Sequence, residues 1–454
     1  MSSPRIFSAL LFLLDAVLLA GVFTAAAWLR HVPLSAEYLQ GVLPVPLALV
    51  LACLYLIDGY NRETDMLGQD YASQHLIASL GALVATLLAT YVVSTESTPL
   101  QISRLVIAGS FAAFAPLSLL LRRLIRLRII RGFRYRALVF IGTPRDWESF
   151  RADCKRHGMR QPLFFARIEQ AAGKDDSGAH ISGILDEVER GGVRVEAIVV
   201  QDSGDALPDA IAERLVRCFF RGIPTFTLDL FQQVYWRKIP LTRLRHAWLF
   251  EEGFDLSRDP VFERLKRLTD IFLSLFGLLL ASPVLLAAAL LIWLEDRGPV
   301  LFAQTRIGRN ERPFRLYKLR TMRQLPPGAQ ANPYTQERDP RITRIGQFLR
   351  NTRIDEFPQL LNVLRGQMSL IGPRAEWDRL VAGYQREIPC YHFRHLVRPG
   401  ITGWAQVNYP YGANTEDTRR KLEYDLYYIR HYSLRLDASI ILKTIHIMLF
   451  GKGR

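Results

Sequence analysis

The sequence predicts a membrane protein in three parts: a bundle of four helical spans, a Rossmann-like α/β module, and a second α/β domain that contains a re-entrant helical hairpin. Three observations indicate this fold class. Apolar stretches crowd the start of the chain, strand patterns alternate with helical ones in the middle, and another charge-free stretch follows. We expect the parts at residues 1–121, 136–250 and 260–454, with a basic juxtamembrane linker at 122–135 and the hairpin at 263–294.

The composition agrees with a protein that is partly in a bilayer. Of the 454 residues, 49% are hydrophobic, and the net charge is +15. This charge indicates an anionic partner, for which phospholipid and nucleotide-sugar phosphate serve as well as nucleic acid. The four cysteines form no C-x-x-C pair, so we expect neither a disulfide framework nor a thiolate zinc site.

Four apolar stretches near the N-terminus are each about long enough to cross a hydrocarbon core of ~30 Å at ~1.5 Å per residue. They are Ile6 to Leu29, Val42 to Ile57, Leu76 to Ser94 and Leu105 to Leu121. Asp15 lies inside the first stretch and is costly in lipid unless it faces another helix. We therefore expect Asp15 at a helix–helix or subunit contact.

Seven arginines follow the fourth stretch, from Arg122 to Arg136. By the positive-inside rule they place the following chain in the cytoplasm, and four crossings then place the N-terminus there too. A nucleic-acid arm is the alternative for such a run, but the adjoining apolar stretch favours the topological role. We expect a lipid bilayer, and no nucleic acid, as the partner of this region.

Strand patterns alternate with helical ones between Arg136 and about His246, which predicts a parallel α/β sheet. The strands are expected at Ala137 to Ile141, Val195 to Val200 and Thr225 to Leu228, and one helix at Asp209 to Phe219. The turn after the first strand reads GTPRDW, with Pro144 and Trp147 where a Rossmann glycine fingerprint would approach a pyrophosphate. We expect a non-catalytic, structural or regulatory module rather than a dinucleotide site.

A second long apolar stretch, Ile271 to Leu294, has 24 residues without a charge and Ser282-Pro283 at its midpoint. Basic residues flank it on both sides, which favours both ends staying in the cytoplasm. A central proline removes a backbone hydrogen bond and bends a helix, and the Ser282 hydroxyl can satisfy the freed carbonyl. We predict a re-entrant hairpin bent at Ser282 and Pro283; a straight span with a mild kink is the alternative.

Two adjacent carboxylates, Asp355 and Glu356, stand among several arginines in the stretch from Leu349 to Trp377. Guanidinium groups neutralise phosphoryl oxygens, and an acidic pair can hold a divalent cation or supply a nucleophile, so the pattern suits chemistry on a phosphate. The alternative is purely structural, because Thr352-x-x-Asp355 also fits a helix capping box.

The region from about Phe262 onward resembles the monotopic phosphoglycosyl transferases, bacterial sugar transferases that start polysaccharide synthesis on a polyprenyl phosphate. Six blocks occur in the family's order over ~190 residues, which makes the signal specific. They are the Ser282-Pro283 hairpin, GPVLFAQTRIGRNERPFRLYKLRTM, DPRITRIGQFLR, RIDEFPQLLNVLRGQMSLIGPRAE, RPGITGWAQVNY and YDLYYIRHYSLRLD. One departure is Ala375, where many members have a second proline after Pro373-Arg374.

The resemblance implies an α/β monotopic phosphoglycosyl transferase domain that moves a hexose 1-phosphate from a UDP-sugar to undecaprenyl phosphate and releases UMP. Asp355 would be the nucleophile of a covalent intermediate, and Asp355 with Glu356 would hold Mg²⁺. It further implies exopolysaccharide, capsule or O-antigen synthesis at the cytoplasmic face of a bacterial inner membrane, and it admits a homodimer.

Further site residues follow from the same resemblance. Arg350, Lys318 and Arg320 are assigned to substrate phosphate, although Lys318 and Arg320 could instead face lipid headgroups. Arg374, Arg398 and Trp404 are assigned to the nucleotide, with Trp404 stacking on uracil or, alternatively, packing in the core.

Two functions of another kind compete with this one. An NAD-dependent membrane sugar-nucleotide dehydratase or epimerase also joins membrane spans to a Rossmann domain, but it needs an intact glycine fingerprint. A non-catalytic scaffold of a polysaccharide assembly complex would not depend on Asp355. The discriminating observations are bound nicotinamide for the first and transfer that survives Asp355→Asn for the second.

Overall fold

The computed structural model describes residues 4–32, 43–61, 64, 66–93, 104–133, 136–159, 161–167, 176–190, 193–201, 209–241, 260–323, 339, 341–409, 412 and 414–450. The chain divides into two compact units. The first is made of Met1–Leu39, Tyr60–Ala72 and Ile102–Pro240, and the second of Gln40–Gly59, Ser73–Gln101 and Leu241–Arg454. Several residues that bound predicted segments or belong to them lie outside the described residues: Val42, Ser94, Arg134, Tyr135, His246, Phe250 and Arg454.

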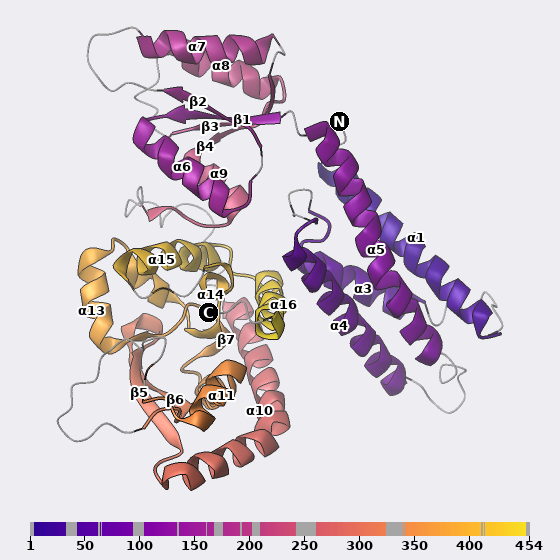
Figure 1. Ribbon diagram of the computed structural model, residues 1–454, viewed down its shortest axis with the longest axis vertical. Helices are drawn as coiled ribbons and strands as arrows, with labels where there is room; N and C mark the ends of the chain where they lie inside the picture. The colour runs from indigo at the N-terminus through magenta and orange to yellow at the C-terminus, as the bar shows by residue number, and fades with distance from the viewer. Residues whose placement is uncertain are drawn as a thin grey trace. The chain divides into compact units, whose positions relative to one another are not determined.

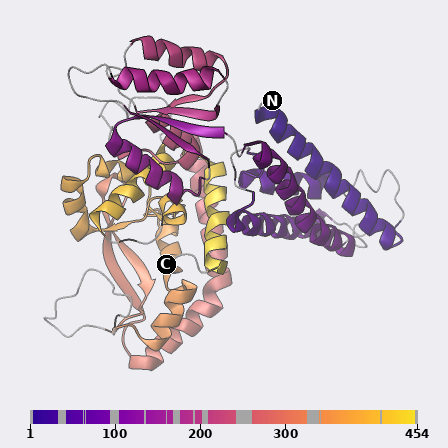
Figure 2. The same cartoon turned by 45° about the horizontal axis from the view of Figure 1, so that its top comes forward.

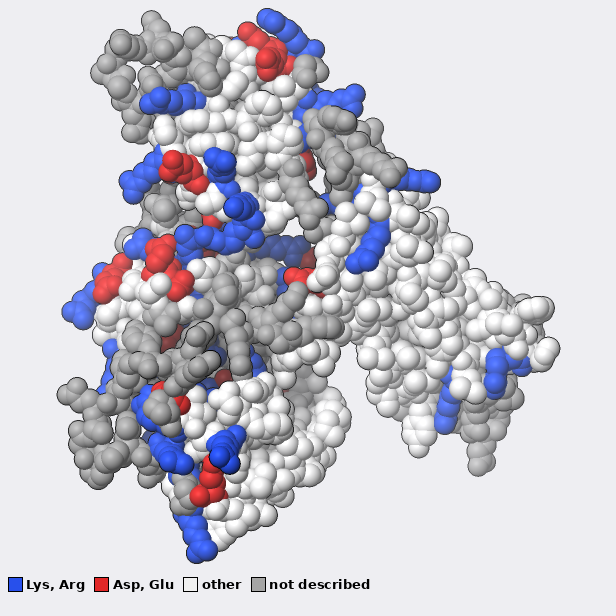
Figure 3. Space-filling model, in the orientation of Figure 1, with Lys and Arg blue, Asp and Glu red and all other residues white. Residues whose placement is uncertain are grey.

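The described residues of the N-terminal part contain four helices: α1 (Pro4–Leu29), α3 (Pro44–Leu56), α4 (Gln69–Val93) and α5 (Arg104–Phe133). Three of them contain candidate membrane spans, and few charged side chains show on the face of these helices that Figure 3 draws. The stretch predicted as the second span forms only α3, whose 13 residues reach about 20 Å, less than a hydrocarbon core. Helix α5 continues through much of the basic run, where a linker was expected.

Asp15 lies at a contact between α1 and α5, as predicted. Its carboxylate pairs with Arg122 and accepts a hydrogen bond of 2.7 Å from the Ser118 hydroxyl, and both charged side chains are buried. The Arg122 guanidinium also lies 5.0 Å from the centre of the Tyr60 ring. The first arginine of the basic run therefore neutralises a buried acid instead of facing water.

The middle module is a parallel sheet with helices on both faces, as predicted. In chain order it contains β1 (Arg136–Gly142), α6 (Pro144–Arg156), β2 (Leu163–Arg167), α7 (Asp176–Glu189), β3 (Arg194–Val200), α8 (Asp209–Phe220), β4 (Thr225–Thr227), α9 (Leu228–Phe231) and a π-helix, η2 (Gln232–Trp236). The strand order is β2-β1-β3-β4, with every pair parallel. Helices α7 and α8 cover one face and α6 and α9 the other (Figures 1 and 2).

The turn after β1 is filled by the module's own side chains. Thr143 caps α6, and its backbone N–H donates to the Gln201 amide oxygen at 2.6 Å. The Gln201 amide nitrogen bonds the Asp146 carboxylate. A side chain at Gly142 would meet that same Gln201 oxygen at 2.6 Å. The helix N-terminus that holds a pyrophosphate in dinucleotide-binding proteins is thus occupied here by an amide and a carboxylate.

The C-terminal domain begins with one long helix and continues with short strands and helices. Its elements are α10 (Pro260–Asp296), β5 (Leu301–Ile307), η6 (Arg309–Glu311), β6 (Pro313–Leu319), α11 (Arg344–Thr352), η7 (Ile354–Glu356), α12 (Gln359–Leu364), β7 (Ser369–Ile371), β8 (Glu376–Trp377), α13 (Asp378–Glu387), η8 (Tyr391–Leu396), β9 (Gly400–Thr402), α14 (Trp404–Asn408), α15 (Thr415–Arg430) and α16 (Leu434–Phe450). Strands β6, β5 and β8 form an antiparallel sheet, while β7 and β9 pair in parallel.

Helix α10 is bent near its middle (Figure 1), where Pro283 interrupts the hydrogen-bond ladder. Pro283 has no N–H for the carbonyl of Leu279, and the Ser282 hydroxyl donates to that carbonyl at 2.8 Å. The serine thus satisfies the group that the proline leaves without a donor, as expected from the sequence. Large apolar side chains such as Phe272, Leu279 and Leu286 are exposed along α10, which is also a candidate membrane span.

Candidate active site

The acidic pair lies on a single 3-10 turn, η7, between α11 and α12. Helix α11 ends at Thr352, and Arg353 takes left-handed backbone angles (φ 56°) that start the turn. The Thr352 hydroxyl donates back to the carbonyl of Phe348 at 2.9 Å, as a residue in a last helical turn does. The alternative that Thr352 is a helix N-cap is therefore wrong.

Glu356 is held by cations. Its carboxylate lies 2.8 Å from the ammonium nitrogen of Lys318, and its other oxygen lies 4.0 Å from the Arg353 guanidinium. Asp355 is buried, and within the described part of the chain no hydrogen bond or ion pair holds its carboxylate. The protein thus neutralises the Glu356 carboxylate, while the Asp355 carboxylate is available to interact with a ligand.

The two carboxyl groups have opposite pKa shifts. Burial raises the pKa of Asp355 above its usual value, because the positive charge of Lys318 compensates only in part. Burial would also raise the pKa of Glu356, but Lys318 and then Arg374 outweigh it and hold that pKa at about 2. Such divergence between adjacent groups is typical of functional sites.

Two predicted phosphate-binding residues lie on β6 or directly after it, and one of them, Lys318, contacts the acidic pair. Lys318 is mostly buried in its pair with Glu356, which argues against a role at lipid headgroups. Arg320 is also buried. Arg350, on α11, donates to the Thr321 hydroxyl at 2.9 Å, which fixes it beside the end of β6. The structure therefore brings all three predicted phosphate-binding residues to one end of β6.

Asn362 is a site-supporting residue that sequence reasoning missed. It is fully buried on α12, its amide oxygen accepts from the backbone N–H of Tyr317 at 3.1 Å, and its amide nitrogen donates to the Arg315 carbonyl at 2.6 Å. These bonds fasten α12 to β6, the strand that carries Lys318. The only signal was a polar residue in the apolar run QLLNVL.

Both arms of α10 pack against the segment that holds the acidic pair. From the first arm, Arg267 donates to the carbonyls of Val363 and, at 2.7 Å, of Leu364 at the end of α12. From the second arm, Ala288 and Ile292 join a hydrophobic cluster, which also contains Leu319, Leu349 and Ile354. The bent helix and the acidic turn are therefore one packed body.

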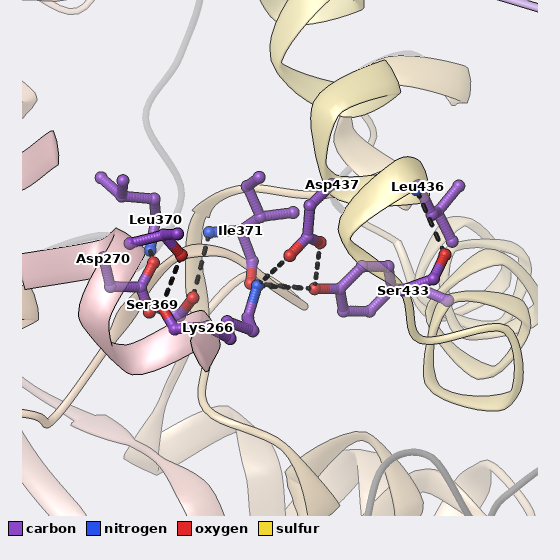
Figure 4. A network of polar contacts seen from close by, with 10 residues as sticks. Lys266, Asp270, Ser369, Leu370, Ile371, Ser433, Leu436 and Asp437 are labelled. Carbon is purple, nitrogen blue, oxygen red and sulfur yellow. Dashed lines mark hydrogen bonds and ion pairs between the residues drawn. The ribbon is translucent and has the colours of Figure 1, made fainter. Parts of the chain in front are cut away.

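A buried polar network ties the first arm of α10 to β7, the short strand that precedes Arg374 (Figure 4). Asp270 accepts from the backbone N–H of Leu370 at 3.1 Å. Lys266 pairs with Asp437, and the Tyr428 hydroxyl lies 2.7 Å from the same carboxylate. That hydroxyl also lies 3.1 Å from the Ile371 carbonyl, so side chains from α10, α15 and α16 hold β7 in place.

The three residues assigned to the nucleotide have different surroundings. The charge of Arg374 lowers the pKa of Glu356, and its carbonyl accepts from buried Arg394 at 3.0 Å. Burial, and then the positive charge of Arg398, lower the pKa of Arg267, so Arg398 lies near the first arm of α10. Trp404 is 2% exposed, packed 6.0 Å from the Tyr427 ring and 4.4 Å from the Lys443 ammonium, which favours the core-packing alternative.

The described residues contain no group of three or more His, Cys, Asp or Glu side chains that could enclose a metal. The fold and site define a membrane-associated α/β protein in which a bent apolar helix supports an acidic pair surrounded by cations. This arrangement suits a reaction of phosphate groups at a lipid surface.

Residues 261–451 match the family described as "Bacterial sugar transferase". "Exopolysaccharide production protein PSS" of Rhizobium leguminosarum bv. phaseoli is 46% identical over 195 residues, which cover 42% of this chain and 98% of that protein. The chain belongs to the bacterial sugar transferase family.

Two longer relatives match in part. "UDP-N-acetylgalactosamine-undecaprenyl-phosphate N-acetylgalactosaminephosphotransferase" of Aeromonas hydrophila is 42% identical over 272 residues, 60% of this chain and 63% of that protein. "UDP-glucose:undecaprenyl-phosphate glucose-1-phosphate transferase" of Escherichia coli (strain K12) is 42% identical over 194 residues, 42% of each chain. The match thus spans less than two thirds of either relative.

Proposed function

We propose that this chain transfers a hexose 1-phosphate from a UDP-sugar to undecaprenyl phosphate and releases UMP, as the first membrane step of exopolysaccharide, capsule or O-antigen synthesis. The observation that carries the proposal is the buried Asp355 carboxylate, which lacks a hydrogen bond or ion pair within the described residues and adjoins the Lys318–Glu356 pair. The names of the Aeromonas and Escherichia relatives specify such transfers with N-acetylgalactosamine and glucose.

The proposed reaction has two displacements at one phosphorus atom. In the first, an oxygen of Asp355 bonds to the sugar-bearing phosphorus while the pyrophosphate bond breaks, and UMP leaves with the electron pair. In the second, an oxygen of undecaprenyl phosphate bonds to the same phosphorus while the bond to Asp355 breaks. Lys318, Arg320 and Arg350, the three predicted phosphate-binding residues at one end of β6, would neutralise the negative oxygens around the phosphorus.

The residues present fit Mg²⁺. This ion takes one or two carboxylates and completes its shell with phosphate oxygens and water, so Asp355 and Glu356 suffice to hold it. The buried Asp355 carboxylate supports the fit, because it has no hydrogen bond or ion pair within the described residues. When bound, the ion neutralises charge on the phosphoryl oxygens.

We propose that α10 is a re-entrant hairpin in the cytoplasmic leaflet of a bacterial inner membrane. The packing of both α10 arms on the acidic segment supports this, since an element that crosses the bilayer would carry one arm away from the domain. Undecaprenyl phosphate has its phosphate at headgroup height, and the hairpin would hold Asp355 there. The basic run after the N-terminal helices supports a cytoplasmic orientation of the following chain.

A labelling experiment tests this topology. Single cysteines at Leu294 and Arg297 should react with a membrane-impermeant maleimide in inverted vesicles, whose cytoplasmic face points outward. They should not react in right-side-out vesicles. A cysteine at Arg264 serves as the matched control on the other arm, and it should label from the same side. Labelling of the two arms from opposite sides would contradict the hairpin.

The activity is tested with purified full-length protein, Mg²⁺, undecaprenyl phosphate and a panel of UDP-sugars, scored by UMP release. We expect release with at least one UDP-hexose and a sugar phosphate on the lipid. No UMP with any sugar would contradict the proposal. The NAD-dependent alternative is opposed by the turn that Gln201 fills, and bound nicotinamide in the purified protein would revive it. A homodimer remains a prediction, which native mass spectrometry would test.

A further inference from the structure

The last turn of α8 presents an unusual apolar surface in the middle module. Phe220 is 82% exposed, more than any other large hydrophobic side chain of the described residues, and Phe219 and Val216 beside it are more than half exposed. The two aromatic rings meet edge to face with centroids 5.8 Å apart. The helix ends immediately afterwards, where Gly222 takes a left-handed conformation (φ 87°), so the pair sits at the end of an element.

Two cations accompany this apolar pair. Arg217 and Arg221 are exposed, and neither makes an ion pair within the described ranges. Arg214, one turn earlier, is instead neutralised by Asp186 and Glu189. We call Val216, Arg217, Phe219, Phe220 and Arg221 together the α8 tip. It combines projecting aromatic rings with uncompensated positive charge.

The topology places the α8 tip at the edge of the module where the chain arrives from the membrane. All strands are parallel, so a helix that connects two of them runs back and ends at the edge where the strands begin. Strand β1 begins at Arg136 on that edge, and α5, a candidate span as far as Arg128, ends at Phe133. Only two residues therefore separate this edge from a membrane helix.

The same edge carries further exposed cations from other elements. Lys155 lies in the last turn of α6, Arg190 directly follows α7, and Arg194 starts β3. An edge with this charge complements anionic lipid headgroups, and aromatic side chains are enriched at headgroup height. A second copy of the same tip is a poorer match, because it would set arginines against arginines.

We propose that the α8 tip docks into the headgroup layer of anionic phospholipid, so that the middle module is held to the membrane at a second point besides α5. The rings of Phe219 and Phe220 enter the acyl boundary while Arg217 and Arg221 pair with lipid phosphates. This contact fixes the orientation of the module on the bilayer. It depends on the proposed cytoplasmic topology but not on the sugar-transfer chemistry.

The depth of a spin label tests the docking in the full-length chain. The four cysteines are replaced by serine, Phe220→Cys receives a nitroxide, and the protein is placed in nanodiscs of phosphatidylethanolamine with phosphatidylglycerol. Leu230→Cys is the matched control, because Leu230 is an exposed apolar residue of α9, which follows the carboxyl end of β4 at the opposite edge. Circular dichroism and thermal unfolding of the labelled and parent chains are compared first, to establish that the labelled chains are folded.

The expected result is a label at 220 that collides with oxygen and is shielded from a water-soluble nickel chelate, while the label at 230 stays open to the chelate. Equal chelate access at both sites would overturn the proposal. So would short spin–spin distances between two copies, which would indicate self-association.

A second measurement avoids labels and cysteine replacement. Hydrogen exchange of the peptide around residues 215–223 is compared in nanodiscs between the parent chain and the double variant Arg217→Glu with Arg221→Glu. The charge reversal should reduce protection at least about tenfold with anionic lipid, since each basic residue near an anionic surface contributes to binding. It should have no effect with phosphatidylcholine alone. An unchanged protection in anionic nanodiscs would refute the docking.

Discussion

The chain contains two α/β regions, and each places a carboxylate near the start of a helix, but the two acids differ in what surrounds them. In the middle module, Asp146 is bonded by Gln201 and Thr143, which fill the turn. In the C-terminal domain, Asp355 is buried, and the ion pair with Lys318 is formed by its neighbour Glu356 and not by Asp355. The comparison teaches that the fold does not assign function; the partners of particular side chains do.

The largest expected effect separates these two acids. Asp355→Asn should lower sugar transfer at least about 10³-fold, because an amide cannot serve as the nucleophile. Asp146→Asn should change it less than about twofold, since this acid only closes a turn. UMP release by equal amounts of folded protein measures both. Transfer that survives Asp355→Asn would support the scaffold alternative instead.

A second effect concerns the pH dependence of the reaction. Asp355 must be ionised to attack, and its pKa is raised, so the rate should fall as the pH drops through that raised pKa. We call this fall in rate at low pH the acid limb of the pH–rate profile. Glu356 has a pKa of about 2 and stays ionised throughout, so it does not set the acid limb. Lys318→Met removes a charge that lowers the pKa of Asp355, and it should move the limb to higher pH and reduce the rate about 10²-fold.

The control for the pH experiment is Lys318→Arg, which keeps the positive charge and should leave the acid limb close to its original position. Rate profiles of UMP release at saturating UDP-sugar provide the comparison. A limb that does not move in Lys318→Met would show that another group governs the acid side.

A third effect compares two side-chain amides, Asn362 and Gln201, each of which holds elements together within its own region. Asn362→Ala should destabilise the protein by about 2 kcal/mol, because it leaves the backbone groups of Arg315 and Tyr317 buried without partners. Gln201→Ala should cost about 1 kcal/mol, because Gln201 is only partly buried. Thermal unfolding in detergent shows which of the two variants loses more stability. Only Asn362→Ala should also reduce transfer, since it loosens the strand that carries Lys318.

The smallest expected effect is that of Ser282→Ala. The substitution removes one hydrogen bond to the Leu279 carbonyl, and such bonds in membranes contribute about 0.6 kcal/mol on average. Transfer should fall less than about twofold. Pro283→Ala is the contrasting variant, because it restores a backbone donor and straightens the helix, and it should impair transfer more. If the two variants reduced transfer equally, the bend of α10 would not contribute to activity.

The sequence was most informative where local chemistry decides the structure. The helix predicted at Asp209 to Phe219 differs from α8 by one residue, and Ser282-Pro283 marked the bend of α10. Local patterns misled where length or context matters. The described residues of the stretch Val42 to Ile57 contain only the short α3, and Thr352 ends a helix instead of starting one. Strand β2 and helix α7 were not predicted.

The site was predictable in part, for a related reason. Motif blocks brought Lys318, Arg320 and Arg350 together with the acidic pair, and the structure places them at one end of β6. Asn362 and Gln201 could not be predicted, because their partners lie 45 to 58 residues away in the chain and the pairing exists only in the folded protein. Burial of Trp404 likewise depends on α15 and α16, which pack against it.

The central claim, that Asp355 is a nucleophile, is tested most directly by withholding the lipid acceptor. Protein is mixed with a UDP-sugar and Mg²⁺ in the absence of undecaprenyl phosphate, and UMP and the intact protein mass are measured together. The account predicts a burst of about one UMP per chain and a sugar phosphate adduct on the peptide that contains Asp355. UMP release that begins only when undecaprenyl phosphate is added, with no adduct on the protein, would contradict it.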